Sequence, residues 1–373
     1  INGLHAFLDR PLWGHGIGST EVIYPLYQER HTAWLTLPET LVESSEMFTG
    51  PLHNDFLQLA VDLGLIGAAL AAALIWLGLK ALRAAGPPRP AYAWGAAGTL
   101  AILMADMGIN FPLQLPATAL LAALAGGVLA NRGRAALSPT EYPLNVAGRV
   151  AVGAGAAGFA ALLAVWGPRE FEADRLMVEA LEPRRFEYRP DEAYALNLRA
   201  YERYPFDRNG RIQLPLTLLQ WRNAARSGGP TPEESDRAFR IGLAADPWSM
   251  ELIVARVEYL LDSGRYPDAG PEIESLLARL REIGPRVVEG YVLDAQYRLL
   301  AGDTGRARQS LAEALRIRAE QAGRPPPPLY RRLAGAPSEW MIWEQRRRER
   351  EVELLLARLS AAVGLPPPPP IRR

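Results

Sequence analysis

Long stretches without charged residues stand out in the first half of the chain. Residues 63–79 carry no charge. With the flanking turns they give about 20 apolar residues, enough for a helix to cross a hydrocarbon core of about 30 Å. Largely apolar stretches occur near 91–110, 115–131 and 147–166, with Asp106 and Arg149 as their only charged residues. The pattern predicts about four transmembrane helices within 56–167, although their glycine and alanine content also suits buried helices of a soluble protein.

Beyond Arg169 the pattern changes to frequent charges, with apolar residues recurring every three to four positions. This spacing is typical of amphipathic helices. Gly264 and Gly302 each precede an alanine by five positions, Ala269 and Ala307, in two similar segments. The segments resemble tetratricopeptide repeats, whose period is about 34 residues. We therefore expect a soluble helical-repeat domain over 168–323, with a plain helical bundle as the alternative.

The end of the chain is marked by two proline runs, 325–328 and 366–370. Proline favours extended polyproline II conformation, so both runs should interrupt helical structure. Between them, 340–359 predicts one long helix rich in arginine and glutamate. The expected fold class is all-α. Its parts are a loop over 1–55, transmembrane helices over 56–167, repeats over 168–323, and a proline-rich linker, charged helix and tail over 324–373.

Basic residues in the loops predict the orientation of the membrane part. They follow the first span and flank the connection between the third and fourth spans, whereas 110–115 carries no charge. Loops rich in lysine and arginine stay in the cytoplasm. We therefore expect the 1–55 loop and 168–373 on the periplasmic side of a bacterial inner membrane. The basic residues are Lys80, Arg83, Arg89, Arg132, Arg134 and Arg149.

Composition narrows the chemistry further. The formal net charge is zero, so nothing favours nucleic acid as a partner. The chain has no cysteine, which excludes disulfides and thiolate catalysis. All four histidines, His5, His15, His31 and His53, lie in the first 53 residues. None of them has the close spacing of metal-ligand motifs, so we expect no metal site.

His53 stands just before the first long apolar segment. On a continuous helix, His53, Ala60, Gly64 and Gly67 would share one narrow face with Leu57 and Ala71. A stripe of small residues lets a neighbouring helix approach closely within a membrane. Asp62 would lie on the opposite face, so we do not pair it with His53. A histidine capping an ordinary spanning helix explains the same pattern.

Three segments carry a family resemblance. They are His53-Asn54 followed by Gly64 and Gly67 (HN-x9-G-xx-G), the PLWGHGIG stretch over 11–18, and NFPLQLPA over 110–117. Together they resemble the O-antigen ligase family of bacterial membrane glycosyltransferases. That family also includes O-antigen polymerases and protein O-oligosaccharyltransferases. The resemblance covers about 8–131. It implies further membrane helices upstream, so we expect this chain to be a C-terminal portion that is inactive alone.

The resemblance implies transfer of a preassembled oligosaccharide from undecaprenyl pyrophosphate to an acceptor hydroxyl, without a metal or other cofactor. Histidine suits the proton transfer, because its pKa lies near working pH. Arginine suits the pyrophosphate, because its guanidinium pairs with two phosphate oxygens at once. The resulting site assignment is His53 as the general base, Arg10 and Arg30 on the phosphates, Asn54 and Asp55 orienting the loop, and Gly64 and Gly67 packing behind it.

Three alternative functions remain open. An O-antigen polymerase would use a glycan as acceptor. A protein O-oligosaccharyltransferase would use a serine or threonine, which the repeats could present. The partners are then the lipid-linked glycan, an acceptor glycolipid or protein, the bilayer, and a protein on the repeat domain. A non-catalytic membrane-anchored repeat scaffold is the alternative from a different class.

Overall fold

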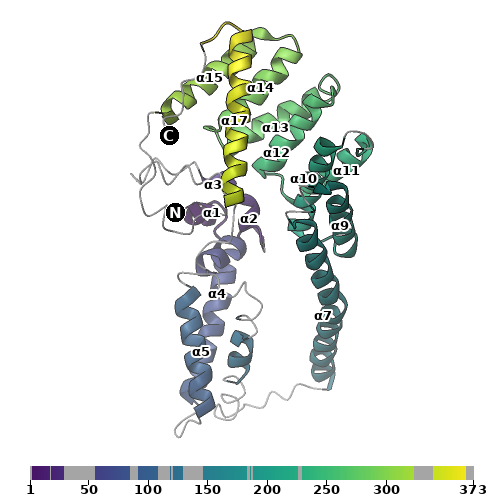
Figure 1. The fold of residues 1–373 in the computed structure, drawn as a ribbon. Coiled ribbons are helices and arrows are strands. Elements are labelled where there is room, and N and C mark those ends of the chain that lie inside the picture. Colours follow the sequence, from purple (N-terminus) through teal and green to yellow (C-terminus); the bar gives the residue numbers. More distant parts are fainter. Residues whose placement is uncertain are drawn as a thin grey trace. The chain divides into compact units, whose positions relative to one another are not determined.

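The computed structural model defines helices along most of the chain (Figure 1). Among the residues that it describes, every regular element is a helix, so the all-α prediction holds for that part. Side chains at some helical positions lie outside the description. The described residues are 2–16, 18–28, 55–84, 91–107, 118, 121–128, 146–182, 185, 188–225, 229–322 and 339–366.

The chain divides into two compact units, with the boundary inside one helix at 161/162. The first unit begins with three short helices, which precede two longer apolar ones. A further short helix covers 121–128. The named helices of this unit are α1 (Asn2–Asp9), α2 (Thr20–Ile23), α3 (Pro25–Gln28), α4 (Asp55–Ala84), α5 (Ala91–Met107) and the start of α7 (Val146–Ala180).

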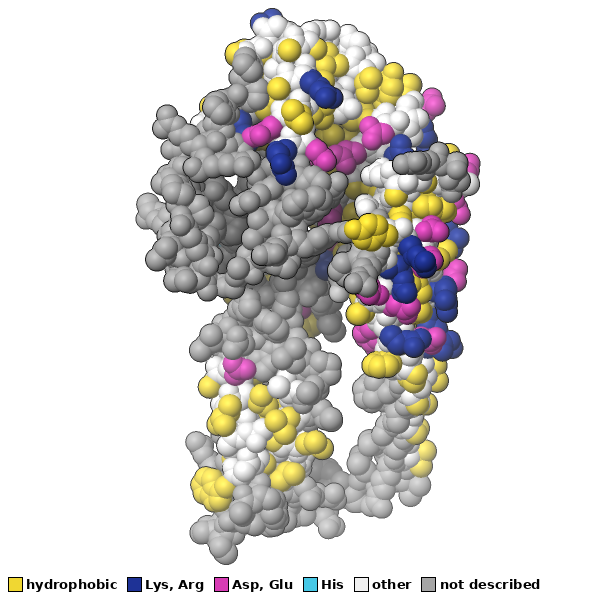
Figure 2. All heavy atoms as spheres, viewed as in Figure 1, with side chains coloured by type: hydrophobic (Ala, Val, Ile, Leu, Met, Phe, Trp, Pro, Cys, Tyr) yellow, Lys and Arg dark blue, Asp and Glu magenta, His cyan; other side chains and the backbone are white. Residues whose placement is uncertain are grey.

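One described segment, Asp55–Ala73 in α4, is long and apolar enough to cross a membrane. Trp94–Met107 in α5 is apolar but shorter. The predicted spans near 115–131 and 147–166 lie partly outside the described residues. The set of about four spans stays a prediction. Figure 2 shows mainly hydrophobic side chains over the described surface of α4 and α5.

The second unit contains the rest of α7 and a series of amphipathic helices (Figure 1). Neighbouring helices pack against each other, and α12 also contacts both α10 and α14. A tetratricopeptide-like arrangement stays a prediction. The helices are α9 (Pro190–Arg203), α10 (Arg208–Ala224), α11 (Pro232–Ala245), α12 (Met250–Asp262), α13 (Gly270–Ile283), α14 (Val288–Leu300), α15 (Thr304–Ala322) and α17 (Glu339–Ala362).

Local sequence explains where these helices begin and end. Thr231 starts α11 with a capping box, in which its side chain and that of Glu234 bond each other's backbone N–H. Two helices stop at glycines with positive φ, Gly264 at 70° and Gly302 at 80°. In each turn the next residue donates back to the last helical turn, Arg265 N–H to Leu260 O and Asp303 N–H to Arg298 O. These are Schellman turns, which confirms that both glycines predicted from the sequence mark turns.

The main core of the second unit lies between α11, α12 and α13. Ile253, Leu260, Ile273 and Leu277 are almost completely buried there, and Phe239 packs with them. Burying a side chain of this size stabilises a fold by about 1.5–3 kcal/mol. The apolar spacing noted beyond Arg169 therefore forms the contact faces of adjacent helices.

α17 belongs to the same unit. The predicted helix over 340–359 is present as Glu339–Ala362, and it packs on α14 and α15. Leu356 is fully buried against Val292, Leu311 and Ala314. The sequence had suggested a separate charged segment over 324–373. The difference arises because Leu355, Leu356 and Leu359 form an apolar stripe at helical spacing that the many charges obscure.

Candidate active site

α4 is broken at Gly64, whose backbone has φ 65° and ψ −162°. A regular helix would bond Leu65 N–H to Val61 O, and Ile66 N–H to Asp62 O. Here the 11–16 loop takes the place of both bonds. Leu65 and Ile66 donate to Pro11 O and Leu12 O at N···O distances of 2.7 and 3.4 Å, while His15 and Gly16 donate to Val61 O and Asp62 O at 2.9 Å each. The loop and the helix therefore interlock through their backbones.

Two glycines make this close approach possible. A Cβ on Gly64 would lie 2.4 Å from Leu12 O and 2.6 Å from Gly14 N. A Cβ on Gly14 would lie 2.3 Å from Asp62 O. Both glycines also have positive φ, which disfavours any residue with a side chain. The PLWGHGIG stretch and the glycine of HN-x9-G-xx-G are thus two sides of one contact.

The break corrects the expected helix face. His53, Ala60, Gly64 and Gly67 would share a face only if the helix were continuous. Gly64 instead interrupts the helical phase, so residues after it do not continue the stripe set by those before it. Gly64 does allow a close approach, but the partner is the backbone of the 11–14 loop. Beyond the break, a Cβ on Gly67 would lie 2.1 Å from Leu63 Cβ, so this position is crowded within α4 itself.

The Asp62 carboxylate binds the segment that follows this loop, residues 18–20. It is only 8 % exposed. One oxygen accepts from Thr20 Oγ1 at 2.7 Å, Thr20 N at 3.0 Å and Ser19 Oγ at 3.1 Å. The second oxygen accepts from Gly18 N at 3.1 Å. Carboxylates satisfy the free N–H groups at a helix start. Asp62 therefore fixes the start of α2 against α4.

α1 and α3 complete this small core. Val61, Ala6 and Tyr27 are buried together. Tyr27 Oη donates to Asp9 Oδ2 at 2.7 Å. His15 Nε2 lies 2.8 Å from Ala6 O, and its ring meets that of Tyr27 edge to face with centroids 6.2 Å apart. His15 therefore has a structural place within the core, and Tyr27 packs inside it as well.

The structure locates only some of the predicted site residues. Asp55 is the first residue of α4 and is buried. Arg10 follows α1 and is exposed, and its N–H donates to Phe7 O. His53, Asn54 and Arg30 lie outside the described residues, so the proposed general base and one phosphate ligand have no described geometry. Since Asp55 directly follows His53-Asn54, whatever fixes the start of α4 also bears on the position of His53.

Asp62 is the residue of this region whose role the sequence did not reveal. On a continuous helix Asp62 would face away from His53, so the sequence predicts no pairing of the two. Its side chain instead reaches Gly18, Ser19 and Thr20, more than 40 positions earlier. A signal was present, because an isolated aspartate in an apolar helix needs partners. A glycine-rich loop followed by Ser19-Thr20 provides the donors for such a carboxylate.

Exposed apolar side chains lie close to Arg10 in the sequence. Trp13 is 76 % exposed, and Leu4, Leu8 and Leu12 are exposed as well. Leu4, Leu8 and Leu12 are spaced four residues apart along α1 and its end. A surface of this kind, next to a guanidinium, is typical of segments that meet lipid at the membrane surface.

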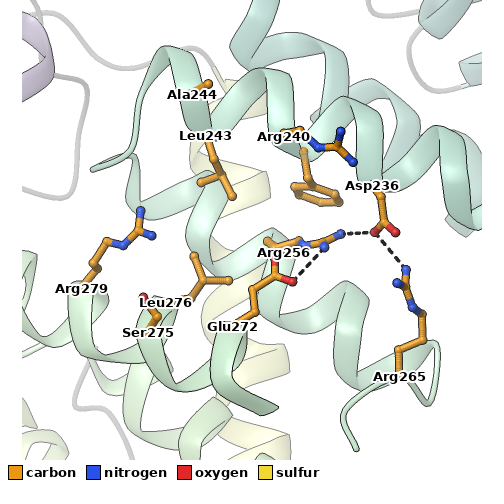
Figure 3. Close-up of a pocket in the computed structure, with 11 residues that line it drawn as sticks. Asp236, Arg240, Leu243, Ala244, Arg256, Arg265, Glu272, Ser275, Leu276 and Arg279 are labelled. Atoms are coloured by element: carbon orange, nitrogen blue, oxygen red, sulfur yellow. Dashed lines mark hydrogen bonds and ion pairs between the residues drawn. The ribbon is translucent and has the colours of Figure 1, made fainter. Parts of the chain in front are cut away.

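The second unit has a separate pocket of about 560 Å³ between α11, α12 and α13 (Figure 3). At its base the buried Arg256 guanidinium bonds Glu272 through two nitrogens, at 2.8 and 3.1 Å, and bonds Asp236 at 2.7 Å. Arg265 also donates to Asp236, at 2.9 Å. Burial alone would raise the pKa of Asp236, but the hydrogen bonds from Arg265 and Arg256 hold that pKa below its usual range.

Two further arginines line this pocket, Arg240 from α11 and Arg279 from α13. Within the described part of the chain, neither has a carboxylate at ion-pair distance, and Arg279 donates to Pro247 O at 3.3 Å. The lining thus carries four arginines and two acids, a formal charge of 4 − 2 = +2. The pocket is best explained as a structural ion-pair network, because its most buried members already satisfy one another.

Among the described residues, which do not include His31 and His53, no group of three or more histidine or acidic side chains is suited to a metal. No protein-family model matches the chain, and no curated protein matches it either.

Proposed function

We propose that the protein is a membrane glycosyltransferase resembling O-antigen ligase. It transfers a preassembled oligosaccharide from undecaprenyl pyrophosphate to an acceptor hydroxyl in cell-surface polysaccharide synthesis. The protein resides in the bacterial inner membrane as a multi-pass protein, with the 1–55 loop and the helical unit facing the periplasm.

The observation that supports this proposal most is the interlock at Gly64. The two segments that carry most of the family resemblance, PLWGHGIG and HN-x9-G-xx-G, lie far apart in the sequence. In the structure they share four backbone hydrogen bonds and need a glycine on each side. An ordinary spanning helix requires neither the break nor the loop. The arrangement suits a site in which a loop must be held rigidly at the entry of a helix.

The surroundings of Arg10 fit the proposed donor. An undecaprenyl carrier has a long apolar chain and a pyrophosphate head. Leu8, Leu12 and Trp13 offer an exposed apolar surface, and Arg10 offers a cation beside it. Guanidinium groups pair well with phosphate oxygens. Arg10 would therefore hold the leaving pyrophosphate, with Arg30 as its proposed partner.

In the proposed reaction His53 takes the proton from the acceptor hydroxyl. The acceptor oxygen forms a bond to the anomeric carbon of the glycan, and the bond from that carbon to the pyrophosphate oxygen breaks. Undecaprenyl pyrophosphate leaves with the bonding electrons, and its charge is balanced by arginine. Asn54 and Asp55 orient the His53 loop, and Gly64 lets the 11–16 loop support it from behind. The reaction needs no metal or other cofactor.

The helical unit is proposed to bind a protein partner or to present the acceptor. Its successive helix pairs, and the contacts of α12 with both α10 and α14, are compatible with tetratricopeptide-like stacking. Stacked helix pairs offer extended surfaces to partners.

The test uses the full-length gene, deleted in its host and restored as wild type or as His53→Ala at equal membrane levels. His31→Ala serves as the matched control, because it removes another histidine of the same loop. We expect His53→Ala to leave lipid-linked glycan accumulating and the acceptor bare, while His31→Ala restores transfer. The molecule left bare, lipid A core, glycan or protein, distinguishes a ligase from a polymerase or a protein O-oligosaccharyltransferase. Full restoration by His53→Ala would instead favour the non-catalytic scaffold.

A further inference from the structure

The first part of α7 is an apolar helix whose described side chains are exposed. The sequence has no charged residue between Arg149 and Arg169. Every described side chain from 150 to 165 is exposed, Val150 and Val165 among them. A helix that is apolar on all sides needs an apolar surrounding, either a protein core or a bilayer. Along α7 the described side chains change from hydrophobic to charged in Figure 2, and the charges begin at Arg169.

An aromatic cluster lies at this change. The Trp166 ring meets Tyr204 and Phe206 edge to face, with ring centroids 6.0 and 5.3 Å apart, and Tyr204 and Phe206 contact each other at 5.9 Å. The Arg169 guanidinium lies 5.3 Å from the centre of the Trp166 ring. The cluster therefore connects α7 to the turn between α9 and α10.

The cluster also contacts the turn of α7 that Pro168 weakens. Pro168 lies inside the helix and cannot donate the hydrogen bond to Ala164 O. Trp166 stands within the same turn, so its contacts with Tyr204 and Phe206 limit how far the helix can bend there. Within the second unit, Trp166 therefore fixes this turn of α7 against the turn between α9 and α10.

We propose that the aromatic cluster of Trp166, Tyr204 and Phe206 lies at the outer bilayer surface and seats the helical unit on the lipid headgroups. The proposal rests on the crossing of the membrane by α7, which is part of the proposed function. Phe206 is 63 % exposed although it belongs to an aromatic cluster, and Phe171, two residues after Arg169, is 74 % exposed. Large exposed aromatic side chains at the end of an apolar helix are typical of the membrane–water boundary.

The charges around the cluster favour lipid over a protein partner. Arg169 can lie along the Trp166 ring and reach the headgroups with its guanidinium. Arg203 and Glu172 form an ion pair just beyond the cluster, on the side where water would be. The order along the chain is therefore apolar helix, aromatic ring with arginine, then paired charges. The same order holds along a bilayer normal, from the hydrocarbon core through the headgroups to water.

This chain has no cysteine, so once any cysteine elsewhere in the full-length protein is replaced by serine, one introduced cysteine gives one unique label. Three variants of the full-length protein in lipid nanodiscs carry the same bimane fluorophore, at Phe206→Cys, Ala157→Cys or Leu300→Cys. Leu300 is an exposed apolar position at the end of α14 and serves as the matched control. The readout is quenching by lipids with a nitroxide either at the headgroup or deep in the chain. Glycan transfer does not enter this readout.

The label at 206 should be quenched at least threefold more by headgroup nitroxide than the label at 300, and less by the deep nitroxide than the label at 157. A label at 206 that is quenched no more than the one at 300, while the label at 157 responds to the deep nitroxide, would overturn the interface assignment and leave the span intact. Absence of quenching at 157 would remove the span, and the proposal with it. Equal deep quenching at 157 and 206 would also contradict it, because the cluster would then be buried in the bilayer.

Discussion

At the scale of single residues, the region around Gly64 shows how one backbone conformation fixes a loop. Alanine at position 64 prefers the right-handed helix, and the backbone conformation there, φ 65° and ψ −162°, costs residues other than glycine about 1–3 kcal/mol. Its Cβ would also overlap Leu12 O. We expect Gly64→Ala to restore a continuous α4 and release the 11–16 loop.

Hydrogen exchange of the peptide covering 11–18 in the full-length protein checks this prediction. Gly95→Ala is the control, because Gly95 lies in α5 and a Cβ there meets nothing within 4 Å. Exchange of the loop amides should rise in Gly64→Ala and stay unchanged in Gly95→Ala. Unchanged protection in Gly64→Ala would mean that the loop does not depend on the break.

Asp236 gives a residue-scale prediction about pH. Its pKa is held below the usual range in the folded state, so its contribution to stability is present above the unfolded pKa and is lost as the pH falls through the folded one. At neutral pH, Asp236→Asn should lower the stability of α12 and α13 by roughly 1–3 kcal/mol, because Arg256 and Arg265 lose a charged acceptor.

The difference between wild type and Asp236→Asn should shrink as the pH falls from about 5 to about 2, because the folded pKa lies below the usual value and protonated Asp236 resembles asparagine. Hydrogen exchange of the α12 amides at each pH measures it. A difference that stays constant over that range would show that the ion pairs do not set the stability of this pocket.

At the scale of elements, α17 illustrates how a charged helix can complete a core. Leu356 is fully buried against α14 and α15, whereas Leu354, two residues earlier, is 60 % exposed. Leu356→Ala should destabilise the α14–α15–α17 packing by about 2–5 kcal/mol. Leu354→Ala should change it by less than about 0.5 kcal/mol. Urea unfolding, monitored by hydrogen exchange of the α14 and α15 amides, measures the loss of stability in each variant. Equal effects would mean that α17 does not pack on this core.

The elements also show how far the sequence could predict the structure. Helix type, the turns at Gly264 and Gly302, and the helix between the proline runs all follow from local rules of spacing and capping. The break at Gly64 and the role of Asp62 depend instead on contacts with residues more than 40 positions away. Local periodicity carries no information about such partners, and it predicted a continuous helix there. The sequence did not predict the packing of α17, because its charges outnumber the buried Leu356 and the partly buried Leu355 and Leu359.

At the scale of the whole molecule, two units differ in the surroundings that their surfaces require. The described part of the first unit exposes apolar side chains on α1, α4 and α5, whereas the second unit carries many ion pairs around its own core. The first suits lipid and the second suits water. A transferase that takes its donor from the membrane and its acceptor from the periplasm requires both. This division is compatible with the proposed function, in which the chemistry is assigned to the His53 loop.

The most direct measurement uses purified full-length protein in nanodiscs with undecaprenyl-pyrophosphate-linked glycan and the acceptor found bare in the deletion host. Transfer of glycan and release of undecaprenyl pyrophosphate are followed together for wild type, His53→Ala and His31→Ala. We predict that wild type and His31→Ala transfer glycan, and that His53→Ala loses at least a hundredfold in rate, a size in line with general base catalysis. Equal rates for wild type and His53→Ala would contradict the central claim.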